Sequence, residues 1–371
     1  MPKKSRSVRR SKPVRRMEGG KVMAAELQKM QLSESDIQSA EKACTAAVGE
    51  FIEEGKPRAN VRGLGVGCKW TDGQPTGEPA LVVLVSRKVD EEHLTKADIV
   101  PPKLQNVQTD VLAVGELFAG NDGIGLQTLA KRLRPAEGGY SVGHFKITAG
   151  TIATCVYDIL PGGSTGVTPA HGLGVPPRFY ILSNNHVLAN SNNAALGDPI
   201  LQPGPFDGGA QPADVIARLS RFVPIQLTPA VPIGLHNNLV DAAVAEGQFH
   251  DLDREIYWNG YVRGWRPRNN VVNMVGQVVK KTGRTTNLTT GRITVVSATV
   301  DVNYGGGQVG RFKDQIITTA MSAGGDSGSL VMTIDNVAIG LLYAGSQQAT
   351  ILNQIEHVRA LLRVEVAEQI L

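Results

Sequence analysis

The chain has 371 residues, which is more than one hydrophobic core usually spans, so two or three structural units are expected. Its 42 glycines, 20 prolines and many Val/Ile/Thr runs favour a β-rich body. The net charge of +4 has a single source, because residues 1–16 carry eight Lys/Arg and no acid, which leaves +4 less 8, or −4, on the remainder. A basic body is therefore excluded, and the basicity belongs to the N-terminal tail.

This basic tail, residues 1–20, is predicted to be disordered. No apolar stretch follows it, and no apolar run in the chain approaches the length of a membrane span, so neither a secretory signal nor a membrane anchor is expected. The widely spaced Cys44, Cys68 and Cys155 do not predict a disulfide framework and favour a reducing, cytoplasmic setting. Two interpretations of the tail stay open: a solvated arm, or an arm that contacts the phosphates of nucleic acid or another polyanion non-specifically.

Residues 21–117 are predicted to form a small α+β accessory module. An amphipathic helix is expected over residues 32–54, because Ser33 and Asp36 form a capping-box-like start and an apolar stripe follows. The strand-like stretches that come next are Val61–Trp70, Ala80–Ser86 and Thr109–Val114. The alternating glycines of the first stretch do not precede a helix start, so a nucleotide site is not expected. The module is therefore expected to serve in docking or autoinhibition.

The remainder of the chain changes character twice. Residues 118–139 are rich in glycine and basic residues, which predicts an exposed interdomain linker. From Tyr140 onward, short strand-like stretches alternate with Gly/Pro/Asn loops, as in sandwiches and barrels. An apolar pattern of helical spacing closes the chain from about residue 353 to 371. The sequence therefore predicts a mostly β body with a C-terminal helix.

One turn of this body carries the residue types that acyl transfer needs. Ser327 lies within Gly324-Gly325-Asp326-Ser327-Gly328, where glycines let backbone N–H groups converge on one point beside the serine hydroxyl. Clusters of Gly, Asp and Ser are equally typical of solvated hairpin loops. The function of the turn therefore depends on whether the chain supplies a base.

His186 and Asp241 are the candidates that would activate this serine. A serine hydroxyl needs a neutral imidazole as base and an acid that holds the ring in one tautomer. His186 lies where the apolar strand 179–182 ends against a polar turn, although a histidine in such a place often has a purely structural role. Asp241 lies inside the apolar run Leu239–Val244, so its carboxylate is expected to be buried and to need a partner.

The chain order His186, Asp241, Ser327 and the turn around the serine resemble the chymotrypsin-fold, or trypsin-like, serine proteases, and most of all the bacterial streptogrisins and alpha-lytic protease. The segments Val279–Ile293 and Ala338–Leu341 are similar to theirs, while Asn184–Val187 is similar to the high-temperature-requirement proteases. The resemblance covers roughly residues 140–371 and is specific over 279–346.

This resemblance implies a Greek-key fold of two six-stranded β-barrels, at about 140–250 and about 270–346, followed by the C-terminal helix. Ser327 would attack a peptide carbonyl, with His186 as the base and Asp241 orienting it. The N–H groups of Gly325 and Ser327 would form the oxyanion hole. No metal or organic cofactor is implied.

Supporting positions follow from the same resemblance. The carboxylate of Asp326 is expected to pair with an internal cation, for which Lys281 is the first choice and Arg284 the second. The base of the substrate pocket would be the uncharged Met321, which favours cleavage after medium apolar residues. The wall of the pocket would be formed by Tyr343, Ala344 and Gly345.

The expected function is that of a serine endopeptidase acting on proteins or peptides. One alternative is a non-catalytic scaffold with a protease-like fold whose basic tail binds nucleic acid. Another is a latent protease that residues 21–139 hold inactive until a partner or nicking near Arg132–Arg134 releases it. The sequence leaves the substrate and the oligomeric state open.

Overall fold

The computed structural model describes residues 30–52, 58, 60–71, 74–119, 129–147, 149–164 and 172–367. The predicted basic tail, the residues predicted to end the first helix and the last part of the predicted C-terminal helix lie outside these ranges. No helix in the described ranges combines the length and apolarity that a membrane crossing requires.

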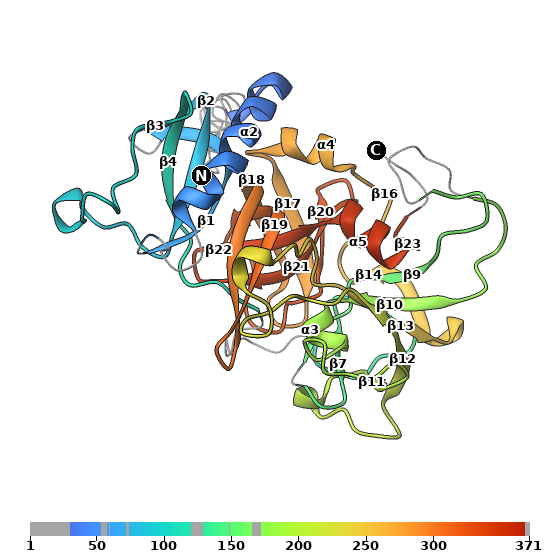
Figure 1. Ribbon diagram of the computed structural model, residues 1–371. Coiled ribbons are helices and arrows are strands. Elements are labelled where there is room, and N and C mark those ends of the chain that lie inside the picture. The colour runs from blue at the N-terminus through green and yellow to red at the C-terminus, as the bar shows by residue number, and fades with distance from the viewer. Residues whose placement is uncertain are drawn as a thin grey trace, which may run out of the picture.

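The C-terminal half of the chain forms a closed β-barrel, called barrel two (Figure 1). Within the described residues, six strands pair in the order β17-β20-β21-β22-β19-β18, and β18 pairs back to β17 to close the ring. These strands are β17 (Val278–Gly283), β18 (Asn287–Gly305), β19 (Gln308–Thr319), β20 (Leu330–Thr333), β21 (Val337–Gly345) and β22 (Ala349–Gln354). Val/Ile/Leu-rich alternation supplies the inward-facing residues.

The preceding part of the chain forms a second ring of strands, called barrel one. Its strands β8 and β9 belong to one continuous stretch, residues 150–158. The start of this stretch pairs with β7, and its end pairs with β10. The pairing order is β8-β7-β11-β12-β13-β10-β9, so this stretch closes the ring. The strands are β7 (Ser141–His144), β8 (Gly150–Thr151), β9 (Cys155–Asp158), β10 (Phe179–Ser183), β11 (Pro199–Leu201), β12 (Val215–Phe222) and β13 (Ala243–Gly247). The predicted mostly β, two-barrel architecture is confirmed.

Shorter elements surround the barrels. A small sheet contains β6 (Ala136–Gly138), β14 (Leu252–Ile256) and β15 (Gly260–Tyr261), while β16 (Gly264–Trp265) pairs with β21. The α-helices here are α3 (Asn185–Leu188), α4 (Arg268–Val271) and α5 (Ile355–Leu362). The 3-10 helices are η1 (Glu91–His93), η2 (Pro205–Asp207), η3 (Ile233–Leu235), η4 (Phe249–Asp251) and η5 (Val272–Met274).

The N-terminal module is continuous with barrel two and is not a separate packing unit. Its strand β1 pairs with β18, so β1, β2, β4 and β3 extend the barrel sheet, and α2 packs on β1 and β2 (Figure 1). One apolar cluster combines Phe51 of α2 and Leu64 of β1 with Val279 and Ile293 of the barrel. The elements are α2 (Glu34–Phe51), β1 (Val61–Thr71), β2 (Gln74–Val85), β3 (Lys103–Leu104) and β4 (Val107–Ala113). Removing the module would therefore expose the apolar surface of barrel two.

Two predicted segments differ from the structure. The segment predicted as an exposed linker contains β5 (Phe118–Ala119), the buried Leu129 and the buried strand start Ala136. The predicted C-terminal helix ends early, because Arg363 adopts a left-handed φ of 55° and β23 (Val364–Glu365) then pairs with β9. Strand pairing in both places overrides local composition, which gave no signal of it.

Candidate active site

His186 lies on the one-turn helix α3, directly after β10 of barrel one. The apolar core residues of β10 fix the end of the strand, and the buried amide of Asn184 ties it to the Asp241 segment by donating to the Asp241 carbonyl over 2.7 Å. His186 Nδ1 lies 2.6 Å from Asp241 Oδ2, and the backbone N–H of His186 donates to the other carboxylate oxygen over 3.1 Å. One carboxylate therefore holds His186 both at its ring and at its backbone.

Asp241 precedes β13 and is completely buried, as its apolar sequence context predicted. Its backbone N–H donates to the Asn353 side chain over 3.0 Å. Its carboxylate accepts a further bond, 2.8 Å long, from the hydroxyl of Tyr304 on β18. A buried carboxylate with several charge-assisted donors has a fixed orientation, which in turn fixes the imidazole.

Tyr304 is the site residue that sequence reasoning missed. It comes from barrel two and crosses to the acid of barrel one, and its ring meets the His186 ring edge-on at 6.2 Å between centroids. Burial and the charge of Asp241 raise the pKa of Tyr304 well above its ordinary value. The phenol therefore stays protonated and donates a hydrogen bond to the Asp241 carboxylate. A tyrosine followed by a glycine-rich turn carries no local signal of this long-range contact.

Ser327 lies in the turn between β19 and β20, which barrel one holds in place. Thr151 of β8 donates its backbone N–H to the Ser327 carbonyl over 2.7 Å and its hydroxyl to the Gly325 carbonyl over 2.8 Å. Gly328 has a φ of +97°, and a Cβ there would lie 2.1 Å from Ser183 Oγ, so only glycine fits. The serine turn is thus packed directly against the strand that leads to His186.

The hydrogen bond between the Ser327 hydroxyl and His186 is not formed in this structure. His186 Nε2 is buried and has no hydrogen-bond partner among the described residues. The two segments are nevertheless neighbours, because a Cβ added to Gly150 would lie 2.5 Å from the Val187 side chain and 2.9 Å from the Ser327 carbonyl. Catalytic hydrogen bonds are often loose or absent before substrate binds.

The N–H groups predicted to form the oxyanion hole are available. Neither Gly325 nor Ser327 donates a backbone hydrogen bond to another group in the described ranges. Gly325 has a φ of +92°, and a Cβ there would lie 2.5 Å from Thr285 Oγ1, which explains the need for glycine. An oxyanion requires N–H groups that are available to donate, and the N–H groups of Gly325 and Ser327, which flank Asp326, meet this requirement.

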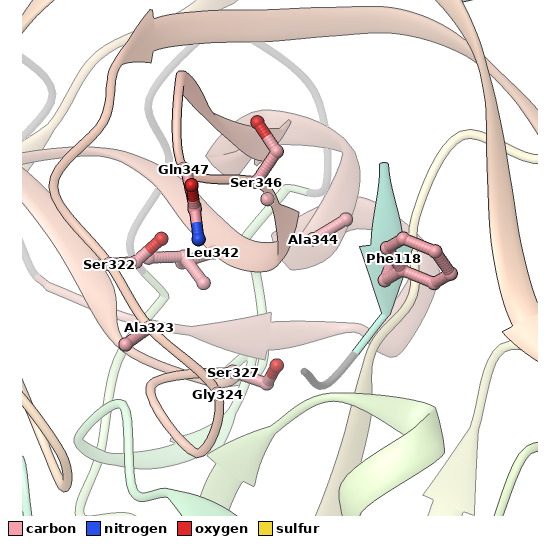
Figure 2. A pocket seen from close by; sticks show the side chains of 10 residues that line it. Phe118, Ser322, Ala323, Gly324, Ser327, Leu342, Ala344, Ser346 and Gln347 are labelled. Atoms are coloured by element: carbon pink, nitrogen blue, oxygen red, sulfur yellow. The ribbon is translucent and has the colours of Figure 1, made fainter. Parts of the chain in front are cut away.

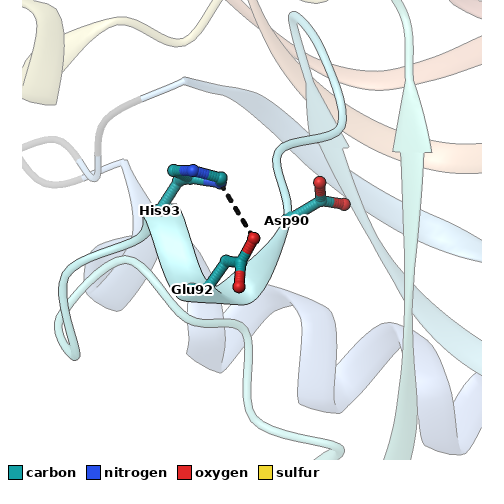
Figure 3. Close-up of side chains that lie close together, drawn as sticks. All are labelled: Asp90, Glu92 and His93. Carbon is teal, nitrogen blue, oxygen red and sulfur yellow. Dashed lines mark ion pairs between the residues drawn. The ribbon is translucent and has the colours of Figure 1, made fainter.

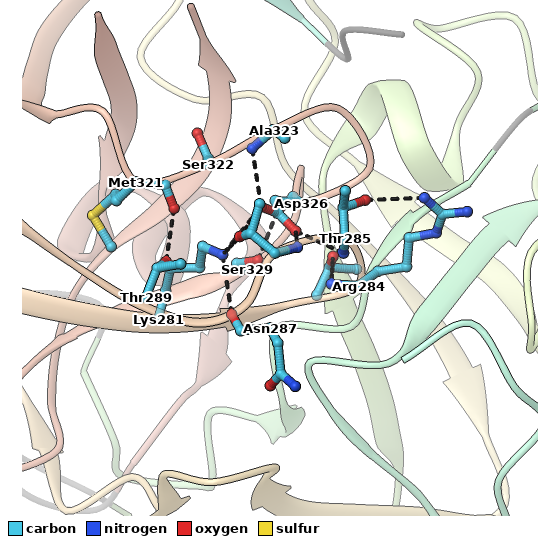
Figure 4. A network of polar contacts seen from close by, with 12 residues as sticks. Lys281, Arg284, Thr285, Asn287, Thr289, Met321, Ser322, Ala323, Asp326 and Ser329 are labelled. Atoms are coloured by element: carbon cyan, nitrogen blue, oxygen red, sulfur yellow. Dashed lines mark hydrogen bonds and ion pairs between the residues drawn. The ribbon is translucent and has the colours of Figure 1, made fainter. Parts of the chain in front are cut away.

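Asp326 anchors this turn through a buried network (Figure 4). Its carboxylate accepts from the N–H groups of Thr285, Thr286 and Ala323 over 2.8, 3.1 and 3.0 Å. Lys281 Nζ lies 3.1 Å from the same carboxylate, and both side chains are fully buried. Burial lowers the pKa of Lys281, an effect that the Asp326 charge opposes. Lys281 thus occupies the predicted position beside Asp326.

Arg284, the second choice for this pairing, has a different partner. Its guanidinium donates to Asp207 of η2 in barrel one, with Nε at 2.8 Å and Nη2 on the other oxygen. The fork geometry of the guanidinium matches one carboxylate, and the Asp207 carboxylate takes both of its donors. Arg284 therefore ties the two barrels together and does not neutralise Asp326.

A pocket of about 210 Å³ opens beside Ser327 (Figure 2). Its lining includes Ala344 and Gly345, as predicted. It is lined by Phe118, Ser322, Ala323, Gly324, Ser327, Leu342, Ala344, Gly345, Ser346 and Gln347. All of these side chains are uncharged, so within the described residues no lysine, arginine or histidine reaches the pocket.

Two predicted pocket residues point elsewhere. Met321 faces the core of barrel two, where its sulfur would lie 2.6 Å from a Cβ added to Gly291, and Ser322 faces the pocket instead. Tyr343 is fully buried with its ring 4.8 Å from that of Phe312, and its neighbour Leu342 lines the pocket. Successive side chains of extended chain point to opposite faces, so the prediction was one residue out of phase in each case.

A separate group of metal-ligand types lies in the N-terminal module (Figure 3). Asp90 directly precedes η1, and its side chain lies close to those of Glu92 and His93 within η1, whose ion pair is 3.8 Å long. All three side chains are exposed, and exposed carboxylates gather commonly in the absence of an ion. We assign no metal site to them.

Comparisons with known proteins agree with the resemblance over limited stretches. Residues 55–114 match the family described as the NARROW LEAF 1 N-terminal domain. The chain is 47% identical to glutamyl endopeptidase 2 of Streptomyces griseus over 76 residues, which are 20% of this chain and 35% of that protein. It is 43% identical to serine protease 1 of Streptomyces fradiae over 77 residues, 21% of this chain and 20% of that protein.

Among solved structures, protease A of Thermobifida fusca is similar with a TM-score of 0.40 and 16% identity, covering 62% of this chain and 97% of that one. The chain spans about a third of the glutamyl endopeptidase and a fifth of the serine protease that it matches. The predicted resemblance to bacterial serine proteases is confirmed over these stretches.

Proposed function

We propose that the protein is a serine endopeptidase whose triad is His186, Asp241 and Ser327. The observation that carries the proposal is the state of the His186 ring: Nδ1 is held 2.6 Å from a fully buried carboxylate, and Nε2 is buried with no hydrogen-bond partner in the part of the chain that the structure describes. A carboxylate on Nδ1 places the ring proton there, so Nε2 is the acceptor that a general base needs.

The chemistry would run in two steps at this site. Ser327 Oγ attacks the peptide carbonyl carbon while His186 Nε2 takes the hydroxyl proton and then gives it to the leaving amine. Water then attacks the acyl-serine, again through Nε2, and releases the acid product. The N–H groups of Gly325 and Ser327 stabilise the oxyanion in each step, typically by about 3 kcal/mol per donor.

The pocket supports a preference for small or medium uncharged side chains. The pocket has a volume of about 210 Å³, and its lining includes the apolar side chains of Leu342 and Ala344. The hydroxyl of Ser322, which also lines the pocket, is hydrogen-bonded to that of Thr350 at 2.7 Å. One similar protein is named a glutamyl endopeptidase. A buried glutamate carboxylate would need a cation or several donors, and the described lining provides no cation, so we do not extend that preference to this chain.

Digestion of a mixture of denatured proteins, followed by mass spectrometry of the new termini, tests this function. We expect cleavage after Leu, Met and Ala, few sites after Glu, Lys or Arg, and none with the Ser327→Ala variant. Equal cleavage by wild type and Ser327→Ala would contradict the proposal. A dominant preference for Glu would contradict only the account of the pocket.

The setting of the enzyme is part of the proposal. Cys44, Cys68 and Cys155 are all buried, and no disulfide joins them in the part of the chain that the structure describes, which supports a reducing, cytoplasmic environment. The basic tail lies outside the described residues, and its contact with polyanions stays a prediction. The comparisons do not favour the non-catalytic scaffold, because the curated relatives are serine proteases.

A further inference from the structure

Strand β5 joins two strands of barrel two that are not neighbours in the barrel. Phe118 and Ala119 pair antiparallel with Gly345 and Ala344 of β21, and Phe118 also pairs in parallel with Asn303 of β18. On its other side, the same part of β21 pairs with Ile351 and Thr350 of β22. Residues 344–345 therefore have a strand on both sides, and β21 has no free edge there.

The residues before β5 hold it in this place. Leu117 is buried in a cluster with Tyr343 and Phe312, and its carbonyl accepts the backbone N–H of Asn303 over 3.0 Å. The Val114 carbonyl accepts a hydrogen bond from the hydroxyl of Ser346, just beyond the end of β21. The segment that enters β5 is thus fastened to both strands that β5 joins.

β5 lies at the proposed catalytic centre. The ring of Phe118 lines the same pocket as Ser327, at the end where β5 enters (Figure 2). Asn303, its partner in β18, directly precedes Tyr304, whose hydroxyl donates to the catalytic acid candidate Asp241. β5 therefore adjoins the strand that carries Tyr304 on one side and lines the pocket through Phe118 on the other.

Ala344 and Gly345 line the pocket beside Ser327, so an extended peptide with a side chain in this pocket would meet this part of β21. Extended peptides bind proteins by adding a strand to an unpaired sheet edge, where backbone hydrogen bonds supply affinity and pockets select alternate side chains. Since β22 and β5 already flank this part of β21, no unpaired backbone remains for an incoming peptide.

We propose that β5 occupies the site where the peptide backbone binds, so that a protein substrate is cleaved only when it displaces β5. This inference rests on the proposed endopeptidase function and names the contact that limits access to it. Phe118 and Ala119 act as a substrate-like strand, and Phe118 narrows the entrance of the pocket. The protein is then latent toward extended peptides while its nucleophile stays accessible to small reagents.

The test weakens β5 in the full-length chain. Phe118→Gly removes the ring from the pocket, and Ala119→Pro adds a residue that cannot donate to a strand ladder, so the double variant favours release of β5. Phe249→Ala is the matched control, because Phe249 is an exposed phenylalanine that packs on Phe179 in barrel one. Circular dichroism establishes that all three proteins are folded.

Two chromogenic substrates separate the site of β5 from the nucleophile. Succinyl-Ala-Ala-Pro-Leu-p-nitroanilide needs the β21 edge, whereas acetyl-leucine p-nitrophenyl ester has no residue that could pair with it. We expect the ratio of kcat/KM for the peptide to kcat/KM for the ester to rise at least tenfold in the double variant, because both substrates use the pocket that Phe118 lines and only the peptide needs the β21 edge. We expect this ratio to be unchanged in the control. A kcat/KM for the peptide that falls or stays constant relative to kcat/KM for the ester would overturn the inference.

A binding measurement keeps this inference distinct from the proposed function. In a Ser327→Ala background, fluorescence anisotropy of fluorescein-labelled Ala-Ala-Pro-Leu should show at least tenfold tighter binding to the β5 double variant. A synthetic peptide of residues 112–119 should compete with the probe. Tighter binding without hydrolysis in the Ser327 protein would support the role of β5 and refute the endopeptidase. Hydrolysis with unchanged binding would overturn the role of β5 alone.

Discussion

Replacing Lys281 with methionine tests how the turn of the nucleophile is held. The side chain has similar length, so Lys281→Met removes the charge and leaves the Asp326 carboxylate fully buried without its cation. Removing one partner of a buried ion pair typically costs 3–5 kcal/mol. The remaining donors are the N–H groups of Thr285, Thr286 and Ala323 and the Thr286 hydroxyl at 2.6 Å. They offset part of the loss, so we expect about 3 kcal/mol.

Urea unfolding followed by tryptophan fluorescence measures this change in the free energy of unfolding. Asp326 directly precedes Ser327, so we also expect Lys281→Met to lower kcat of the peptidase. The same substitution in a Ser327→Ala background should weaken the affinity for a substrate-like peptide by a smaller factor. Lys280→Met is the control, because the neighbouring lysine is only partly buried and its side chain has no described ion pair. A loss below about 1 kcal/mol for Lys281→Met would refute the argument, since the backbone donors alone would then satisfy the carboxylate.

Three other outcomes follow from the contacts of buried polar groups. Tyr304→Phe should lower kcat about tenfold with little change in KM, because a hydrogen bond to a charged group contributes about 1.5–3 kcal/mol and this one positions Asp241; an unchanged kcat would contradict the role. Burial raises the pKa of Tyr304 and Tyr343 well above the ordinary value of 10, so above about pH 10 only the unfolded state loses these protons. The free energy of unfolding should therefore fall with rising pH, by up to about 1.4 kcal/mol per pH unit per tyrosine. Urea titrations of each Tyr→Phe variant should show a shallower dependence of this free energy on pH. Burial raises the pKa of Cys44 and Cys155 to about 12, so iodoacetamide at pH 8 should modify them only after denaturation; rapid labelling of the native protein would contradict their burial.

The sequence was informative where chemistry demands particular residue types. A serine flanked by glycines, a histidine at a strand end and an aspartate inside an apolar run made Ser327, His186 and Asp241 candidates, and their chain order then resembled that of the bacterial serine proteases. Lys281 was predicted from the resemblance to the bacterial serine proteases, and its ammonium lies 3.1 Å from the Asp326 carboxylate. These residues are recognisable because burial of a polar side chain is costly and leaves few explanations.

The sequence was less informative where one residue of phase or a long-range pairing decides the outcome. Met321 and Tyr343 were placed in the pocket, but strand pleating turns Ser322 and Leu342 toward it instead. Residues 118–139 look like a linker by composition, yet Phe118 pairs with both β18 and β21. Neither outcome has a local signal, because each depends on partners far away in the chain.

The central claim is that the Ser327 hydroxyl becomes a nucleophile when His186 takes its proton. Labelling with a fluorophosphonate probe, followed by intact mass and peptide mapping, tests it directly in wild type, Ser327→Ala and His186→Ala. The account predicts one adduct on Ser327 of the wild type and none in either variant. An adduct on another residue, or equal labelling of Ser327 when His186 is replaced, would contradict it.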